Sequence, residues 1–106
     1  MSSSGARPQP FTAEELRAFI REALSSGSYR EIGHSRIDRT YRNIRNDDIV
    51  HGLERDDWQL VDAPEFDPKR ACWRYKISTV DVEGDPLNLI VSARTELCRI
   101  DIITKW

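Results

Sequence analysis

The chain has 106 residues, of which 39% are hydrophobic and 32% charged, and its formal net charge is −2. These values are typical of one soluble globular domain with a modest core, and they exclude binding of polyanions through net charge alone. No apolar run approaches the roughly 18 residues of a membrane span, and the N-terminus lacks the layout of a signal peptide. We therefore expect a cytoplasmic protein without a membrane partner.

The N-terminal third predicts a tail followed by one amphipathic helix. Residues 1–10 (MSSSGARPQP) are small, polar and proline-bearing, which predicts a disordered tail before a single domain over 11–106. In FTAEELRAFIREALSSG, Thr12 is the expected N-cap, and Glu15 completes a capping box. Apolar residues then recur at helical spacing as far as Gly27. The next few residues, SYREIG, predict a short extended link or an edge strand.

The stretch HSRIDRTYRNIR, residues 34–45, has an arginine at every third position. Ile37, Tyr41 and Ile44 form one apolar stripe at 3.6-residue periodicity, so we expect a second helix with its arginines on the opposite side. Two interpretations stay open for that side: a solvated helix face, or a surface that binds phosphates. The arginines concerned are Arg36, Arg39, Arg42 and Arg45.

The rest of the chain predicts one more helix and then a sheet. NDDIVHGLERDDW, from residue 46, is expected as a short helix with Asn46 as N-cap, and APEFDPK is expected as a loop because it holds two prolines. VEGDP is expected as a hairpin turn. The predicted fold class is α+β, with N-terminal helices packed on one face of a twisted antiparallel sheet of about four strands. The expected strands cover 58–63, 70–79, 87–93 and 98–104.

Charge and cysteine usage add little that is specific. Residues 29–46 carry a net charge of +3 and residues 47–69 a net charge of −6, which predicts a basic and an acidic side. Most of the basic residues are arginine, which indicates either phosphate or carboxylate recognition or a GC-rich genome. Cys72 and Cys98 match no zinc-site spacing, and we expect reduced thiols in strands.

The polar face of the predicted sheet is the second candidate surface. Arg74, Lys76 and Arg99 lie on it, with Asn88 and Ser92 beside them, and this face is either merely solvated or a binding surface. Cleavage of RNA through its 2′-hydroxyl needs a proton acceptor, a proton donor and fixed cations.

The sequence supplies one residue suited to the proton-transfer role. His34 is the plausible base, because arginine stays protonated at neutral pH. Arg74, Lys76 and Arg99 would then be the catalytic cations, and Asn88 would join the helix arginines in holding phosphate. No metal site and no cofactor motif is expected.

Two segments carry a resemblance to a family of small, uncharacterised bacterial domains. GHSRIDRTYRNIRNDDI resembles the family's opening H-A-x-x-R-x-x-x-R-G-I, and GDPLNLIVSARTELCRIDIITKW resembles its ending G-x-P-L-H-V-V-V … I-I-T-V-Y. The family's first arginine falls at Asp38, its glycine at Asn43 and its strand histidine at Asn88. The matching residues are His34, Arg42, Ile44, Ile49, Gly84, Pro86, Leu87, Ile102, Ile103 and Thr104.

The resemblance implies a fold and two alternative functions. Such domains are grouped with RelE-like toxins in the barnase–EndoU–colicin–RelE fold, and HGLERDDW resembles the helical pair of MqsR-type toxins. This implies a metal-independent endoribonuclease, the toxin of a toxin–antitoxin system, with RNA as substrate and a cognate antitoxin as partner. The alternative is a non-catalytic module of the same fold that binds RNA or a protein.

Overall fold

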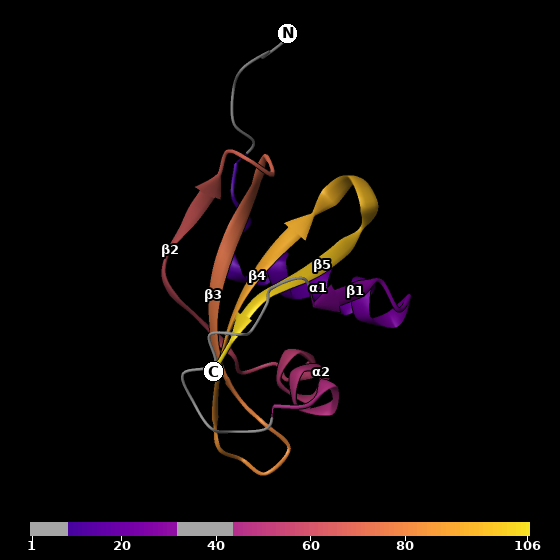
Figure 1. Cartoon of the computed structure of the whole chain (residues 1–106), viewed down its shortest axis with the longest axis vertical. Helices are drawn as coiled ribbons and strands as arrows, with labels where there is room; N and C mark the ends of the chain where they lie inside the picture. The colour runs from indigo at the N-terminus through magenta and orange to yellow at the C-terminus, as the bar shows by residue number, and fades with distance from the viewer. Residues whose placement is uncertain (1–8, 32–43) are drawn as a thin grey trace, which may run out of the picture.

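The computed structural model describes residues 9–31 and 44–106 of the chain. Residues 1–8 of the predicted tail over 1–10, and most of the predicted second helix, therefore lie outside the described residues. The described residues form two α-helices, one short 3-10 helix and five strands (Figure 1). Their bounds are α1 Ala13–Ser25, β1 Tyr29–Glu31, α2 Asn46–Glu54, β2 Gln59–Asp67, β3 Cys72–Val80, β4 Pro86–Arg94, η1 Thr95–Leu97 and β5 Arg99–Lys105.

The five strands form one mixed sheet in the order β1-β5-β4-β3-β2. β2 to β5 follow one another as an antiparallel meander, whereas β1 lies parallel to β5 at the edge. The α+β class is confirmed. The expectation of about four strands is wrong by one, because Tyr29–Glu31 pairs with Ile100–Ile102 instead of serving only as a link.

Helix α1 forms where the capping pattern predicts it. Thr12 accepts a hydrogen bond from the Glu15 backbone N–H at 3.2 Å, and the Glu15 carboxylate accepts one from the Thr12 N–H at 2.9 Å. Together these bonds satisfy two amide groups that the first turn leaves open. Leu16 and Ile20 are fully buried one turn apart, which fixes the face that packs on the sheet.

Helix α2 begins at Asn46, so the prediction of Asn46 as N-cap is wrong by one residue, and the N-cap is Arg45. The Asp48 carboxylate replaces the expected cap, since it accepts a hydrogen bond from the Arg45 N–H at 2.9 Å. Its other oxygen accepts one from the Val82 N–H at 3.2 Å. Asp48 thereby joins the start of α2 to the turn between β3 and β4.

Strand β2 runs through most of the segment expected to be a loop. It ends at Asp67, and its pairing with β3 shifts between Val61 and Glu65. This bulge holds Asp62, whose φ is +64°, and Pro64. Proline is tolerated at a bulge because the ladder is already interrupted there, which is why Pro64 did not end the strand as expected. The second proline, Pro68, follows directly after the last strand residue, Asp67.

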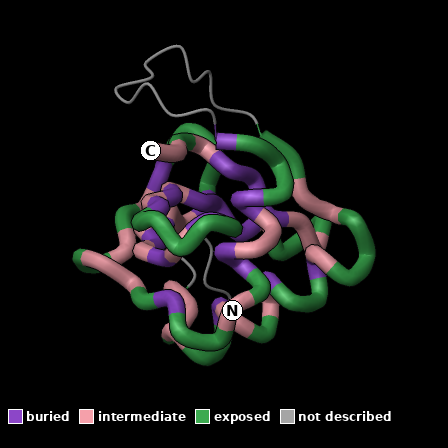
Figure 2. The backbone as a smooth tube through the Cα atoms, turned by 90° about the horizontal axis from the view of Figure 1, so that it is seen from below, coloured by how far each residue is buried: buried purple, intermediate pink, exposed green. Residues whose placement is uncertain are grey.

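Both helices pack on one face of the sheet and enclose a single core (Figure 2). The predicted alternation is seen in most of β3 to β5, since the residues expected to face inward are buried apart from Trp73, which is partly buried. On the opposite face, Cys72, Ser92 and Asp101 are buried as well. Burying one large aliphatic side chain contributes roughly 1.5–3 kcal/mol, so this layer dominates the stability of the domain. The fully buried sheet residues on this side include Ile77, Leu87, Leu89, Val91 and Ile100.

Candidate functional site

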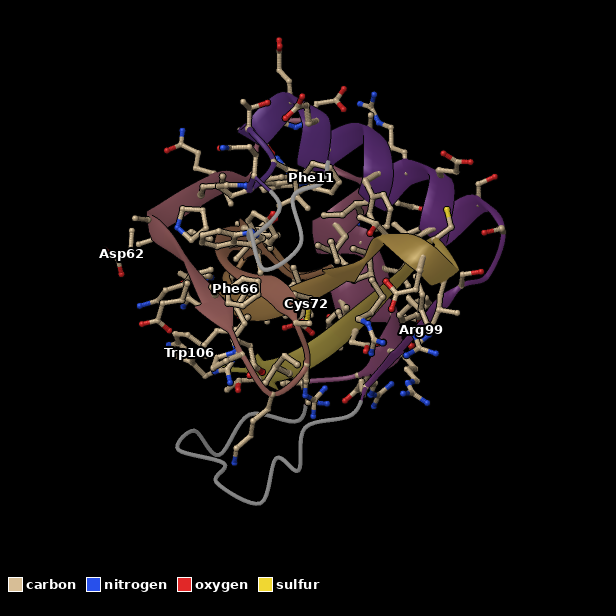
Figure 3. The ribbon with its side chains drawn as sticks, turned by 90° about the horizontal axis from the view of Figure 1, so that it is seen from above. Phe11, Asp62, Phe66, Cys72, Arg99 and Trp106 are labelled. Carbon is tan, nitrogen blue, oxygen red and sulfur yellow. The ribbon has the colours of Figure 1, made fainter. Side chains whose placement is uncertain are left out.

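The face of the sheet that points away from the helices carries the predicted cations. We call this surface the open face; it bears Arg74 and Lys76 on β3, Asn88 and Ser92 on β4, and Arg99 on β5. Figure 3 shows Arg99 and Trp106 on the side away from α1, whereas Phe11 lies under the helix. The two helices of the described part of the chain, α1 and α2, therefore lie on the other side of the sheet.

Arg74 is engaged by a carboxylate of the neighbouring strand. Its Nη2 lies 3.2 Å from Oδ2 of Asp67, which is only 7% exposed. Burial alone would raise the pKa of the Asp67 carboxyl, but hydrogen bonds from Arg74 and from the Lys69 backbone N–H outweigh it. The pKa of Asp67 therefore lies below its ordinary value. Asp67 is thus an anion fixed beside Arg74 at neutral pH.

Lys76 lies beside a shallow cavity that the bulge of β2 opens. Its Nζ is 3.6 Å from Oδ2 of Asp62 and 5.5 Å from the centre of the Trp106 ring. The cavity has a volume of about 230 Å³. Its walls therefore combine both charge signs with an apolar side chain. The lining residues are Asp62, Ala63, Glu65, Arg74, Tyr75, Lys76 and Ile90.

Arg99 belongs to a cluster of arginines around one buried carboxylate. Asp101 is 0% exposed, and its Oδ1 accepts a hydrogen bond from Arg99 Nε at 2.7 Å. Arg30 on β1 and Arg94 on β4 approach the same carboxylate at 3.5 and 3.9 Å. Hydrogen bonding raises the pKa of Arg94 and lowers the pKa of Glu96, its second partner. We call Arg30, Arg94 and Arg99 the arginine cluster.

The three predicted catalytic cations do not meet at one point. Arg74 pairs across the sheet with Ser92, and Ser92 pairs with Asp101. Arg74 and Arg99 therefore stand two strands apart and two residues out of register, a separation of about 12 Å between their backbones. Each cation has its own carboxylate partner, so a single phosphate would have to compete with internal ion pairs.

Of the other predicted site residues, two lie within the described residues. Arg45 is exposed and lines a hollow of about 470 Å³ among acidic side chains, so its surroundings are not those of a phosphate site. Asn88 exchanges two backbone hydrogen bonds with Trp106, which aligns them at one end of the open face. His34, Arg36, Arg39 and Arg42 lie outside the described residues.

Sequence reasoning passed over two residues that matter most on this face. Asp101 was placed on the polar side by alternation, but nothing local to its sequence indicates that three arginines from three strands surround it. Ser92 is 0% exposed, and its Oγ has no hydrogen-bond partner. The alternating pattern could have located both residues, whereas their burial depends on neighbours that only the fold supplies.

Cysteines and metal ligands offer no second site. Cys72 is buried in β3, whereas Cys98 lies just before β5 with φ of +46°, not within a strand as expected, and both thiols are free. Across residues 9–31 and 44–106, no group of three or more His, Cys, Asp or Glu side chains is arranged to hold a metal ion. In the same part of the chain, no helix has the length and apolar character to cross a bilayer.

Comparisons with protein-family models, with curated proteins and with solved structures give no match for this chain. The resemblance to RelE-like domains therefore stays a prediction. Any function has to be argued from the open face itself.

Proposed function

We propose that this chain is a non-catalytic module that binds single-stranded RNA on the open face of its sheet. The observation that carries the proposal is the engagement of Arg74, Lys76 and Arg99 by Asp67, Asp62 and Asp101. Cations held by internal carboxylates are rigid hydrogen-bond donors, which suits recognition of a strand. They are poorly suited to stabilising the extra charge of a cleavage transition state, because their own charge is largely compensated.

Aromatic and polar groups on the same face support a single strand as the ligand. Trp106 is half-buried beside Lys76, so a base could stack on the part of the ring that stays exposed. Stacking of a base on an aromatic ring contributes about 1–3 kcal/mol and works for any base. The cavity next to Lys76 and the polar side chains of Ser78 and Asn88 add hydrogen-bonding groups along the strand path.

Charge balance decides how such binding should depend on salt. Among the described residues, six basic side chains on or beside the open face stand against five carboxylates, so its net charge is only about +1 and long-range attraction is weak. We therefore expect a shallow log–log salt dependence with a slope of about −1 to −2, because few phosphates are neutralised. The residues counted are Arg30, Arg70, Arg74, Lys76, Arg94 and Arg99 against Asp62, Glu65, Asp67, Glu96 and Asp101.

The test is fluorescence anisotropy with a labelled single-stranded RNA, measured for the full chain and three variants. Lys76→Ala and Trp106→Ala should each weaken binding, by about threefold or more, through loss of a donor and of the stacking surface. Arg21→Ala is the matched control, because Arg21 is an exposed ion-paired cation on α1, on the other side of the sheet. Equal losses in all three variants would refute the open face as the binding surface.

The second candidate is the endoribonuclease implied by the resemblance. One observation favours it: Arg74, Lys76 and Arg99 lie on the same face of the sheet, opposite to α1 and α2. A structured RNA would be incubated with the wild-type chain and with His34→Ala and Arg74→Ala. Cleavage that both substitutions abolish would replace the binding module by an enzyme, whereas intact RNA or cleavage that persists in both variants rejects these residues as catalytic. We keep the cytoplasmic location predicted from the sequence in either case.

A further inference from the structure

The arginine cluster brings together residues far apart in the sequence. Arg30, Arg94 and Arg99 come from β1, β4 and β5, and each approaches Asp101 within 4 Å. Arg30 and Asp101 are also direct neighbours in the parallel pairing of β1 and β5. One fully buried carboxylate therefore fixes three guanidinium groups at one corner of the open face.

Most of the donor capacity of this cluster is unused. Each guanidinium has several N–H groups in a planar fork. Within the described residues, Arg99 donates two hydrogen bonds to Asp101 and Arg94 donates two to Glu96, while Arg30 contributes an ion pair at 3.5 Å. Counting the described part of the chain, three positive charges face two carboxylates, which leaves one net positive charge in the cluster.

An unsatisfied hydroxyl lies at the same corner. Ser92 is fully buried at the position paired with both Asp101 and Arg74, and its Oγ lacks a hydrogen-bond partner. Nε of Arg74 is likewise buried and without a partner. Buried polar atoms are rarely left unpaired in native proteins, and a bound ligand or water is the usual partner.

We propose that the arginine cluster is a phosphate-binding subsite, which Asp101 holds in shape and Glu96 occupies when no ligand is bound. The identity of the bound anion rests on the proposed function, since we expect it to be a terminal or internal phosphate of a bound RNA strand. The two carboxylates differ in solvent exposure, as their separate roles require. Asp101 is 0% exposed, whereas the Glu96 side chain is 61% exposed and free to leave.

These two carboxylates allow a test in which both variants change the net charge by the same amount. Asp101→Asn and Glu96→Gln each remove one negative charge from the arginine cluster, and both carboxylates are ion-paired with Arg94. If the cluster acts only through net charge, both variants bind inorganic phosphate more tightly. In an organised subsite, Glu96→Gln strengthens binding by about two- to fivefold, because a competing exposed ion pair is lost. Asp101→Asn weakens it by about tenfold, because the arginines lose their common support.

Affinity would be measured by titrating the full chain with inorganic phosphate and following the arginine Nε and Ser92 amide signals by NMR. Opposite effects of the two variants support the subsite. Effects of the same sign, or no saturable shift in the wild type, overturn it. Thermal melting of each variant checks that it is folded.

A surface variant keeps the test decisive if Asp101→Asn does not fold. Arg30→Gln removes a cluster arginine that is 55% exposed, and Arg21→Gln is its control on α1, 56% exposed and likewise paired with an aspartate. Phosphate affinity should fall about two- to fivefold in the first variant and stay unchanged in the second. Equal affinity in both would reject the subsite.

RNA binding is measured separately, so that the two proposals can fail independently. Oligonucleotides with a 5′-phosphate and with a 5′-hydroxyl distinguish a terminal phosphate from a backbone phosphate as the occupant. If inorganic phosphate binds saturably but RNA does not bind, the phosphate subsite stands and the RNA module is rejected. If inorganic phosphate and the cluster variants leave RNA binding unchanged, the RNA module stands and the phosphate subsite is rejected.

Discussion

Asp67 illustrates how a single buried carboxylate links the open face to stability. It accepts hydrogen bonds from Arg74 and from the Lys69 N–H, at 3.2 and 3.0 Å, and its pKa is lowered in the folded chain. A carboxyl with a lowered pKa stabilises the fold above its unfolded pKa of about 3.9 and loses that contribution as pH falls through the folded value. Asp67 is thus a source of acid sensitivity.

Asp67→Asn should therefore be less stable than the wild type at neutral pH, and the difference should shrink in acid. Urea denaturation at about pH 7, 4 and 3 measures this, since the two unfolding free energies should approach each other below the unfolded pKa of about 3.9. A difference that stays constant over this range would show that Asp67 contributes as a hydrogen-bond acceptor but not as a charge.

Ser92→Ala should stabilise the chain in the absence of ligand. The wild-type hydroxyl is fully buried without a partner, and leaving such a group unsatisfied costs about 1–3 kcal/mol. We expect the free energy of unfolding to rise by about 1 kcal/mol in urea denaturation without phosphate. A decrease would indicate that the hydroxyl is hydrogen-bonded in solution.

At the scale of elements, α2 lies unusually close to β3. A Cβ built on Gly52 would stand 2.6 Å from Cγ2 of Thr79 and 3.0 Å from the carbonyl oxygen of Val80. The Thr79 hydroxyl donates to the Gly52 carbonyl at 2.9 Å across the same contact. Because Gly52 has no side chain, the backbone of α2 can contact the Thr79 side chain of β3 directly.

Gly52→Ala should lower the free energy of unfolding by about 1–3 kcal/mol, although alanine favours the helix, because the added methyl group overpacks this contact. Thr79→Ser removes the closest methyl but keeps the hydroxyl, so the double variant should recover about 1 kcal/mol of that loss. Chemical denaturation of both single variants and the double variant gives this coupling. Strictly additive effects would contradict the close approach of α2 to Thr79.

Across the whole molecule, the two charge signs separate along the strands. Acidic side chains gather where α2 begins and where β3 turns into β4, around the hollow that Arg45 also lines. The arginine cluster lies toward the other end of β4, which starts at Pro86 and ends at Arg94. The predicted basic side depends mostly on residues 32–43, which lie outside the described residues, so it stays a prediction. The arginine cluster is a separate feature, formed by strands of the sheet.

The sheet should be most protected at β4, which has a full-length partner on each side. Leu87, Leu89 and Val91 are all 0% exposed, so opening β4 exposes the core. We expect amide hydrogen exchange to be slowest in β4 and fastest among the sheet residues at the bulge of β2 and in β1. Hydrogen exchange followed by NMR measures this, and equal protection of β2 and β4 would contradict it.

The sequence by itself determined the local features of this protein. The capping box at Thr12, the alternation of β3 to β5 and the helices-then-sheet order are each encoded within a few neighbouring residues, and all appear in the structure. For the same reason the open face and its cations could be placed in advance. The predictions that concern residues 1–8 and 32–43 remain predictions.

Only the tertiary structure decided which charges meet. The pairing of β1 with β5 brings Arg30 to a carboxylate 71 positions away, and the bulge of β2 carries that strand past Pro64 to Asp67. No local pattern encodes such contacts, because they depend on strand order and register across the whole sheet. The same long-range pairing buries Asp101, and it converts a set of free cations into a network of ion pairs.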